Sequence, residues 1–267
     1  MQLVTAPNGV CYLRSDLIAF PHGFSTRVGG VSTLPHTASL NLAFGRGDAD
    51  AVVLTNLARF TEAVGVPGEV ISLPQVHSAD VRIVGEADRG LGYFHPAKDA
   101  CDGYVTADKG VSIGVKTADC VPILLADEEA GVVGALHAGW RGTVAGIARV
   151  GVARMISLGA DPARIKAAIG PAIGSCCYTV GEDFCRAVAG SPCANLCLPH
   201  IYRREEQPTA DLPAMNVAIL RSAGLREENI DCTHLCTCCR TDLFYSHRAS
   251  QGLRGTMLNL IAIPKGE

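Results

Sequence analysis

Residues 121–159 read VPILLADEEAGVVGALHAGWRGTVAGIARVGVARMISLG and combine two hydrophobic periodicities. Short apolar runs at 121–126 and 131–136, separated by a polar turn, predict two consecutive strands. From Thr143 to Leu158, apolar side chains recur every three or four residues, which predicts a helix with one buried face. Gly159 is suited to end that helix. Strands that are followed directly by a helix indicate an α/β or α+β fold.

The rest of the chain continues this alternation without internal repeats or low-complexity segments. Asp48 is a suitable N-cap for a helix that ends at Val64. Residues 191–209 are polar and lack periodicity, so they predict a surface loop. We therefore expect a single domain over residues 1–267. Further helices are predicted at 181–188 and 212–223, and further strands at 70–73, 111–115, 165–169, 230–235 and 257–263.

Composition argues against several classes of protein. The chain has 23 basic and 26 acidic side chains, a net charge of −3, and no basic run that would hold a nucleic-acid backbone. No apolar stretch reaches about 18 residues, so no membrane-spanning helix is expected. The N-terminal residues MQLVTAPNGV lack the basic and apolar regions of a signal peptide, which favours a cytoplasmic protein.

Twelve cysteines are an unusual count for a chain long enough to be stable without disulfides. In a reducing compartment we expect free thiols, available for metal binding or catalysis. A C-terminal group of cysteines could form a closed metal site, but a second C-x2-C pair is missing, so reduced core and turn cysteines are the favoured interpretation. This group consists of Cys232, Cys236, Cys238 and Cys239, with His234 and His247 nearby.

Three further His and Cys side chains lie at predicted strand ends, namely His77, Cys120 and His137. Two imidazoles and one thiolate are a good ligand set for Zn²⁺, and three protein ligands leave a fourth position for water or substrate, as in catalytic sites. From spacing alone an alternative stays open, in which the histidines are hydrogen-bonded strand-end residues and the cysteine belongs to the core.

The predicted helix after these strands opens with glycines at 139 and 142, which would let a ligand approach the backbone. The N–H groups at a helix N-terminus attract anions, and Arg141 could add a fork of donors for a phosphate or carboxylate. The alternative is a tight turn with an exposed arginine.

Seven motifs distributed along nearly the whole chain carry a family resemblance. Together they resemble the YfiH/YlmD family, also called laccase-domain proteins, whose members have been described as polyphenol oxidases, peptidoglycan editing factors and purine nucleoside phosphorylases. The matching motifs are HGFSTRVGGVS (22–32), SLNL (39–42) with GD (47–48), QVH (75–77), TADCVP (117–122), HAGWRG (137–142), GPAIG (170–174) and DLFYSHR (242–248).

The resemblance implies an α/β sandwich with a mixed sheet flanked by helices, similar to a class of cysteine hydrolases. It implies that His77, Cys120 and His137 are zinc ligands. The implied activity is phosphorolysis of adenosine, inosine and S-methyl-5′-thioadenosine, with some adenosine deamination. Purine nucleosides and phosphate are then the expected small-molecule partners.

On this hypothesis Arg46 and Arg141 are the expected phosphate donors, because phosphorolysis needs phosphate held beside C1′ of the sugar. Asp119 and Gln75 are expected to orient the metal ligands or the substrate. The chain departs from the family pattern at Thr179, where a glutamate is frequent, and at Thr256, where an arginine is common. If either missing side chain contacts substrate, the preference of this protein will differ.

Two other enzyme classes and one non-enzymatic class compete with this hypothesis. A hydrolase or amidase that edits cell-wall precursors could use the same metal. A copper-dependent polyphenol oxidase is implied by the word laccase, and Cu²⁺ is a possible occupant because it outcompetes Zn²⁺ for most N/S sites. Multicopper clusters use His-x-His pairs, however, and none of the eight histidines lies two residues from another. A metal-stabilised binding module without turnover is the remaining class.

Overall fold

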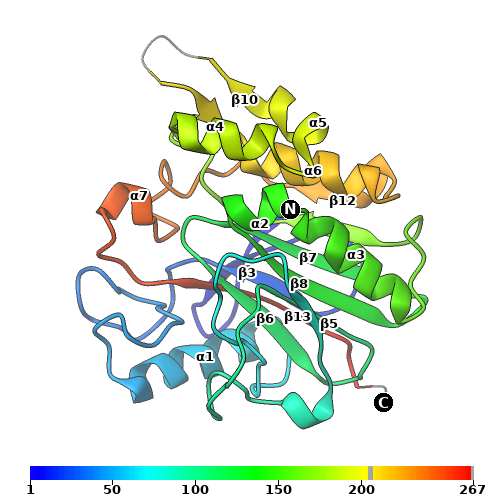
Figure 1. Cartoon of the computed structure of the whole chain (residues 1–267). Coiled ribbons are helices and arrows are strands. Elements are labelled where there is room, and N and C mark those ends of the chain that lie inside the picture. Colours follow the sequence, from blue (N-terminus) through cyan, green and yellow to red (C-terminus); the bar gives the residue numbers. More distant parts are fainter. Residues whose placement is uncertain (204–206, 266–267) are drawn as a thin grey trace.

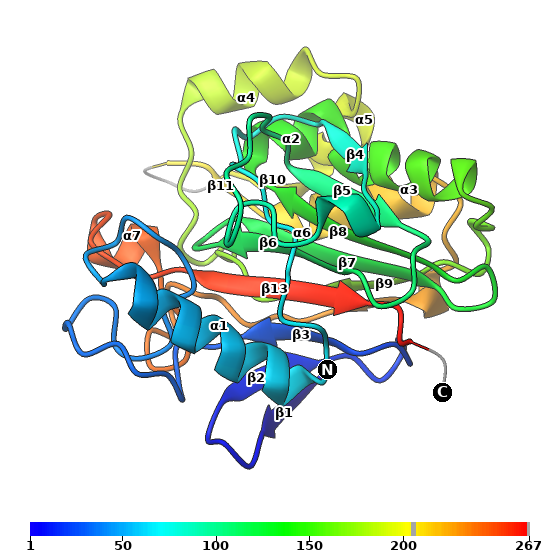
Figure 2. The ribbon, with the colours of Figure 1, turned by 90° about the horizontal axis from the view of Figure 1, so that it is seen from below.

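Two β-sheets face each other between outer helices in the computed structural model, which describes residues 1–203 and 207–265 (Figure 1). Helix α1 (Asp50–Val64) covers the outer face of the first sheet, whereas α3 (Ile147–Ser157) and α6 (Leu212–Ser222) cover the outer face of the second (Figure 2). The order of layers is therefore helix, sheet, sheet, helix, and the expected α/β architecture is confirmed.

The first sheet has five antiparallel strands in the order β1-β2-β3-β13-β6. Strand β13 lies between β3 and β6, so a strand from the last residues of the chain is an inner strand of this sheet. The strands are β1 (Gln2–Thr5), β2 (Cys11–Arg14), β3 (His22–Ser25), β6 (Ser112–Thr117) and β13 (Met257–Ala262).

The second sheet has six strands in the order β12-β9-β7-β8-β5-β4. The outer pairs, β12 with β9 and β4 with β5, are parallel, and the other neighbours are antiparallel, so the expected mixed sheet is confirmed. The strands are β4 (Val81–Ile83), β5 (Gly103–Thr106), β7 (Val121–Asp127), β8 (Val132–Ala138), β9 (Lys166–Ile169) and β12 (Ile230–Cys232).

Alternating side chains of the two sheets fill three apolar layers. Along β7, Ile123 and Leu125 pack toward α3 and α6, whereas Leu124 and Ala126 pack into the layer between the sheets. Because both faces of this strand are buried, its sequence reads as a continuous apolar run. Below the first sheet a third layer forms against α1, whose buried residues include Leu57 and Phe60.

Four expectations about local structure are corrected, and the first is the strand predicted at 70–73, where the structure has only an isolated bridge at Ile71. The helix predicted from Thr143 to Leu158 is two helices, α2 (Trp140–Ala145) and α3, because Gly146 has φ 87° in the left-handed region and breaks the helical path. Ala49, without a side-chain cap, stands at the N-cap of α1. Asp48 instead accepts hydrogen bonds from Ser32 and Thr37 at 2.8 and 2.9 Å.

The predicted loop at 191–209 contains short elements where the structure describes it, because its apolar residues, such as the buried Cys193 and Cys197, pack on the second sheet's helices. Residues 204–206 of that prediction lie outside the described residues. The elements here are α5 (Ala194–Cys197), β10 (Ile201–Tyr202) and β11 (Thr209–Ala210), and the other short helices are α4 (Glu182–Ala189) and α7 (His247–Ser250). No helix among the described residues is long and apolar enough to cross a membrane.

Candidate metal centre

The β7–β8 hairpin brings two of the candidate ligands together. Val121, the first residue of β7, pairs with Ala138, the last residue of β8. Cys120 immediately precedes β7, and His137 is the penultimate residue of β8, so the register places both at the same end of the hairpin. One antiparallel pairing therefore joins two residues that are separate in sequence.

Asp102 builds the opposite side of the centre. This buried residue precedes β5, and its backbone carbonyl accepts a hydrogen bond from the His137 N–H at 2.7 Å. Its carboxylate accepts a hydrogen bond from His137 Nδ1 at 2.8 Å. It also accepts from the backbone N–H groups of Val76, His77 and Ser78 at 3.2, 3.0 and 2.6 Å. One carboxylate thus fixes both the His137 imidazole and the loop that carries His77.

These hydrogen bonds set the charges of the centre. Burial alone would raise the pKa of Asp102, but hydrogen bonds from His137 and Ser78 outweigh burial and lower it to about 2. Burial would lower the pKa of His137, whereas its bonds with Asp102 and Cys120 raise it to about 9. Burial would raise the pKa of the Cys120 thiol, but the two histidines bring it down to about 6. The residues therefore favour a thiolate at Cys120.

The three side chains fit one metal ion. The ligand atoms of His77, Cys120 and His137 all lie within 4.8 Å of one another. A Cβ on Gly139 would lie 2.4 Å from His77 Nδ1 and 3.4 Å from Cys120 Sγ, so the approach of these ligands requires glycine at this position. Asp102 takes Nδ1 of His137 and leaves Nε2 for a metal, an arrangement typical of metal-bound histidines. Two imidazoles and a thiolate are donors that suit Zn²⁺.

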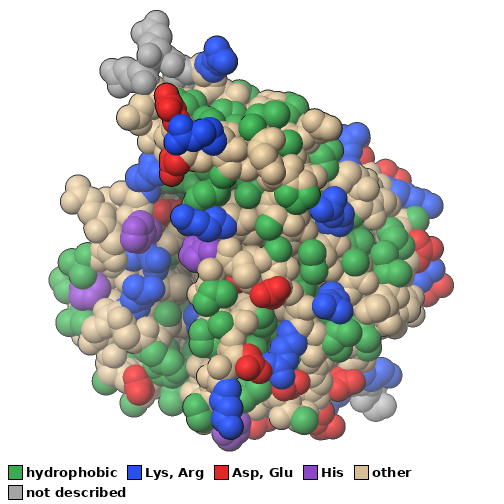
Figure 3. All heavy atoms as spheres, viewed as in Figure 1, with side chains coloured by type: hydrophobic (Ala, Val, Ile, Leu, Met, Phe, Trp, Pro, Cys, Tyr) green, Lys and Arg blue, Asp and Glu red, His purple; other side chains and the backbone are tan. Residues whose placement is uncertain are grey.

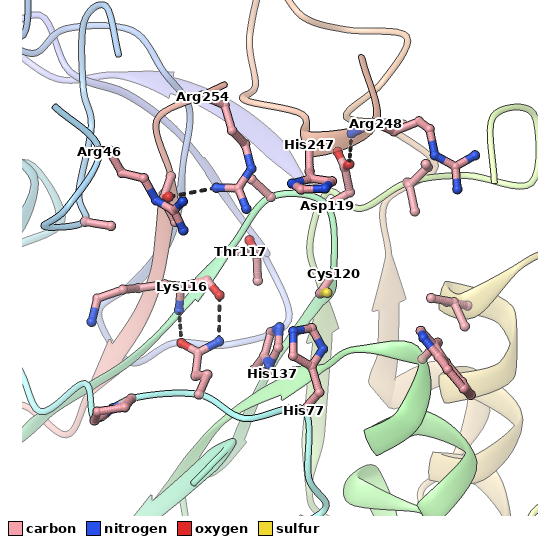
Figure 4. Close-up of a pocket in the computed structure, with 18 of the residues that line it drawn as sticks. Arg46, His77, Lys116, Thr117, Asp119, Cys120, His137, His247, Arg248 and Arg254 are labelled. Atoms are coloured by element: carbon pink, nitrogen blue, oxygen red, sulfur yellow. Dashed lines mark hydrogen bonds between the residues drawn. The ribbon is translucent and has the colours of Figure 1, made fainter. Parts of the chain in front are cut away.

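The centre lines a cavity of about 490 Å³, a size typical of small-molecule sites. In the close-up, His77, Cys120 and His137 converge below a group of arginines (Figure 4). On the surface, Lys or Arg side chains and histidines gather around a hollow between the helices of the second sheet and the C-terminal loops (Figure 3). Apolar and aromatic side chains complete the wall, namely Ala43, Leu73, Pro74, Trp140, Ile173, Tyr178 and Leu212.

Gln75 and Asp119 both line this cavity, but their polar atoms are occupied by other parts of the chain. Gln75 Nε2 donates to the Lys116 carbonyl at 2.8 Å, and Gln75 Oε1 accepts from the Lys116 N–H at 2.7 Å (Figure 4). Asp119 accepts from Thr237 Oγ1 at 2.7 Å and from the Arg248 N–H at 2.8 Å. These bonds position the two segments that carry His and Cys ligands.

Three arginines reach the cavity, namely Arg46 and Arg254 from loops and Arg248 from helix α7. Arg254 Nη1 donates to the Gly255 carbonyl at 3.0 Å and to Thr256 Oγ1 at 2.9 Å. Its Nε is buried and has no hydrogen-bond partner among the described residues. Burial, together with the positive charge of Arg46, lowers the pKa of Arg254 to about 10.

The other cations of the cavity are partly engaged by the protein. Arg248 Nη1 donates to the Cys177 carbonyl at 2.9 Å and to Thr179 Oγ1 at 3.0 Å. Lys116 Nζ donates to the Ser72 carbonyl at 3.1 Å, and burial lowers the pKa of Lys116 to about 8. Among these cations of the cavity, Arg254 therefore has a buried N–H donor that bonds to nothing in the described part of the chain.

Arg141 is placed differently from the other sequence-predicted site residues. The structure brings Arg46, Gln75 and Asp119 to the cavity that contains the metal centre. Arg141 is exposed, and its guanidinium lies 4.3 Å from the ring centroid of Trp140 rather than among the residues that line the cavity. Burial raises the pKa of the Tyr178 phenol to about 12, and the positive charge of Arg141 opposes this rise, so Arg141 lies near the cavity wall.

Comparison with known proteins places the chain in a family. Residues 21–264 match the family model described as multi-copper polyphenol oxidoreductase laccase. The chain belongs to this laccase-like family. It is 40% identical over 266 residues to the purine nucleoside phosphorylase of Deinococcus radiodurans, and the aligned region covers 99% of this chain and 97% of that protein. It is 38% identical over 247 residues to purine nucleoside phosphorylase YlmD of Geobacillus stearothermophilus, covering 90% and 88%.

Solved structures of the laccase-like family share the fold. The crystal structure of YlmD from Geobacillus stearothermophilus has a TM-score of 0.86 at 36% identity and covers 95% of this chain and 96% of that one. The crystal structure of the hypothetical protein YfiH from Bacillus licheniformis has a TM-score of 0.84 at 33% identity, covering 91% and 92%. The resemblance drawn from the sequence motifs is therefore confirmed.

Sequence reasoning did not single out Asp102 or the cavity cations Lys116, Arg248 and Arg254. Asp102 gave only a weak signal, a carboxylate directly before a short apolar strand, which is common in turns. Arg254 was visible beside the departure at Thr256, and the structure shows that its guanidinium bonds to that threonine. Thr179, the other position that departs from the family pattern, likewise accepts hydrogen bonds from an arginine of the cavity, Arg248.

Proposed function

We propose that this laccase-like protein is a zinc-dependent purine nucleoside phosphorylase. Its proposed substrates are adenosine, inosine and S-methyl-5′-thioadenosine, with adenosine deamination as a side activity. The names of the relatives support this reaction class. The cavity supports the two reactants, because it combines an apolar and aromatic wall suited to a purine with arginines suited to phosphate.

The observation that carries the proposal is the buried Nε of Arg254, which lacks a partner among the described residues. A buried donor without a partner costs about 1–3 kcal/mol, so such a group points to a missing acceptor. Arg46 lies near Arg254 on the same side of the cavity (Figure 4), and its charge adds to the unfavourable field at Arg254. A phosphate between the two guanidiniums would supply both the acceptor and the opposing charge.

Phosphorolysis forms a bond between a phosphate oxygen and C1′ and breaks the bond between C1′ and the purine. The purine leaves with the electron pair of that bond and takes up one proton. The products are the sugar 1-phosphate and the free base. Arg46 and Arg254 would hold the phosphate in place for this displacement, while Gln75 and Asp119 keep the surrounding segments rigid.

His77, Cys120 and His137 would hold the zinc ion, with Asp102 fixing the orientation of His137. When bound, zinc supplies a Lewis acid that polarises a substrate atom. The chain's own part is to keep the two imidazoles and the thiolate in place and to present the apolar wall on which the base packs. Trp140 and Tyr178 provide aromatic surface for that purpose.

The decisive experiment measures release of free base from inosine and adenosine by the purified protein, with and without inorganic phosphate. We expect base release that requires phosphate, together with formation of the sugar 1-phosphate. The Cys120→Ser variant, purified in the same way, controls for a contaminating phosphorylase. Base release that is equal without phosphate would contradict phosphorolysis, as would equal activity in the variant.

The alternative activities are outcomes of the same preparation. Amide hydrolysis of a peptidoglycan precursor without any nucleoside turnover would favour the editing enzyme. Phenol oxidation that appears only after loading with Cu²⁺ would show that the His and Cys donors can also support weak oxidation. Ammonia release from adenosine tests the proposed deamination separately.

A further inference from the structure

A second group of ligand-type side chains lies outside the cavity, where two surface turns meet. One turn spans residues 174–178 and contributes Cys176 and Cys177, and the other follows the short bridge at Cys236 and contributes Cys236 and Cys239. The sulfur atoms of these four cysteines all lie within 4.8 Å of one another. The sequence alone showed one C-x2-C pair without a partner, and the fold supplies the missing pair from a distant segment.

We propose that these four cysteines form a closed, structural Zn²⁺ site that clamps the two turns together. Four thiolates around zinc at about 2.3 Å place neighbouring sulfurs about 3.8 Å apart in a tetrahedron. Cys239 Sγ lies 3.5 Å from Cys176 Sγ and 3.4 Å from Cys177 Sγ. These separations are close to the tetrahedral spacing and well beyond the about 2.0 Å of a disulfide.

The backbone around Cys236 is arranged for a thiolate ligand. The Gly174 N–H donates to Cys236 Sγ at 3.2 Å across the two turns. Peptide donors directed at a sulfur stabilise its charged form, which is the form that binds metals.

The space between the turns is also restricted. A Cβ on Gly174 would lie 3.3 Å from Cys176 Sγ and 3.4 Å from Cys236 Cβ, so even a methyl group would crowd the cluster. The Thr237 N–H donates to the Ala172 carbonyl at 3.0 Å and keeps the same two segments in register. The four sulfurs are therefore held by the backbone on both sides.

The position of this cluster gives the proposed metal a role. Thr237, beside Cys236, donates to the carboxylate of Asp119 at 2.7 Å. The carbonyl of Cys177 accepts from Arg248 Nη1 at 2.9 Å. Each turn of the cluster thus supports one polar residue of the cavity wall. A metal there would stiffen the outer support of the cavity without contacting a substrate.

Metal content of the full-length protein tests this proposal, because the two centres share no ligand. Protein purified without chelator should contain two zinc ions per chain. Cys239→Ser should lose one of them and Cys120→Ser the other. Cys238→Ser is the matched control, since this residue lies in the same turn but outside the group of four, and it should keep both.

A spectroscopic measurement with added Co²⁺ tests the site independently of enzyme activity and of the zinc content of the preparation. In the Cys120→Ser background, added Co²⁺ should give the intense thiolate-to-cobalt absorption of a four-sulfur site, and Cys176→Ser should weaken it. If Cys239→Ser fails to fold, Cys176→Ser, which changes an exposed residue of the other turn, replaces it in the zinc count.

Four results would overturn the proposal, the last of them being iron in place of zinc. The first is a single zinc per chain that is lost in Cys120→Ser. The second is an unchanged zinc count in both Cys239→Ser and Cys176→Ser. The third is a disulfide among the four cysteines, found by peptide mapping of freshly purified protein without reductant. Iron at this position would overturn the assignment to zinc.

Discussion

Asp102 Oδ1 lies 2.8 Å from His137 Nδ1, and both side chains are buried. The same carboxylate accepts hydrogen bonds from three backbone N–H groups of the loop that carries His77. A single side chain therefore positions two of the three candidate metal ligands, one through its ring and one through its backbone. Removing the charge of Asp102 should disturb both at once.

Asp102→Asn should weaken zinc binding at the His77, Cys120 and His137 centre by about 10–100-fold, the usual cost of losing an outer-shell partner. The reason is that the Asn side chain has an N–H₂ group where the carboxylate had an oxygen, so His137 or the backbone N–H groups of the His77 loop lose an acceptor. Competition with a chromophoric chelator measures this affinity. Ser78→Ala, which removes only one of the bonds to the carboxylate, is the milder control. Unchanged affinity in Asp102→Asn would contradict the positioning role.

His77→Ala, Cys120→Ala and His137→Ala should each abolish zinc at the first centre and phosphorolysis, while the protein still folds. The ligands lie at strand ends and in a loop, so their loss leaves the three apolar layers unchanged. Zinc content, activity and circular dichroism are measured on one preparation. Cys120→Ala protein that retains its full zinc content would show that the thiolate is not a ligand.

Gly139→Ala should abolish zinc binding although it adds one methyl group. The added Cβ would lie 2.4 Å from His77 Nδ1, which is shorter than any normal contact, so one of the two groups must shift. The His77 loop must then move away from Cys120. Gly131→Ala, which meets nothing within 4 Å but has φ 64°, controls for a general cost of replacing glycine. Normal zinc affinity in Gly139→Ala would exclude the close packing described for the centre.

Arg254→Ala should raise the KM for phosphate by about 10–100-fold, as expected for the loss of a charge-assisted hydrogen bond, with a smaller change in the KM for nucleoside. Arg254→Lys should recover only part of the affinity, because an ammonium group lacks the planar fork. Arg46→Ala should act in the same direction.

Arg141→Ala tests the remaining sequence-based expectation for phosphate binding. Its guanidinium lies on the Trp140 ring, so we expect a smaller rise in the KM for phosphate than in Arg254→Ala. Steady-state kinetics at varied phosphate compare the variants directly. A larger effect at Arg141 than at Arg254 would move the proposed phosphate site toward the start of α2.

Acid stability should depend on Asp127 at the end of β7. Burial alone would raise its pKa, but the N–H groups of Asp161 and Ala130 and the guanidinium of Arg164 outweigh burial and lower it. A lowered pKa contributes stability above the unfolded value of about 3.9, and that contribution is lost as the pH falls through the folded pKa.

Asp127→Asn should therefore lower the Tm at pH 7 by about 4–8 °C, which corresponds to a loss of about 2 kcal/mol. The difference from the unmodified protein should shrink as the pH falls below about 4. Thermal unfolding followed across that range measures both values. A Tm difference that is the same at pH 7 and at pH 3 would show that the charge of Asp127 contributes nothing.

The sequence predicted the second sheet better than the first. Strands β7 and β8 are long apolar runs next to each other, so both their type and their pairing follow from local pattern. Strands β1 to β3 of the first sheet have four residues each, too few for periodicity to separate them from loops, and β4 and β5 of the second sheet are equally short. Among them, β3 pairs with β13 and β5 pairs with β8, and both partners lie far along the chain.

The candidate site shows the same limit. His77, Cys120 and His137 were singled out because rare residue types stood at strand ends, a local signal. Asp102 and Arg254 act through contacts with distant segments, and nothing next to them in sequence marks those contacts. The cysteine cluster is the clearest case, because half of its ligands come from the turn at Cys176 and half from the turn at Cys236.

The position of β13 between β3 and β6 bears on how the protein folds during synthesis. Its residues Leu258 and Leu260 pack toward α1, whereas Met257 and Ile261 pack between the two sheets. During synthesis, β3 and β6 leave the ribosome long before the strand that joins them. Until β13 emerges, each presents an unpaired edge and an uncovered apolar face, which are the features that recruit chaperones or drive aggregation. The first sheet can therefore close only after residues 257–262 have emerged.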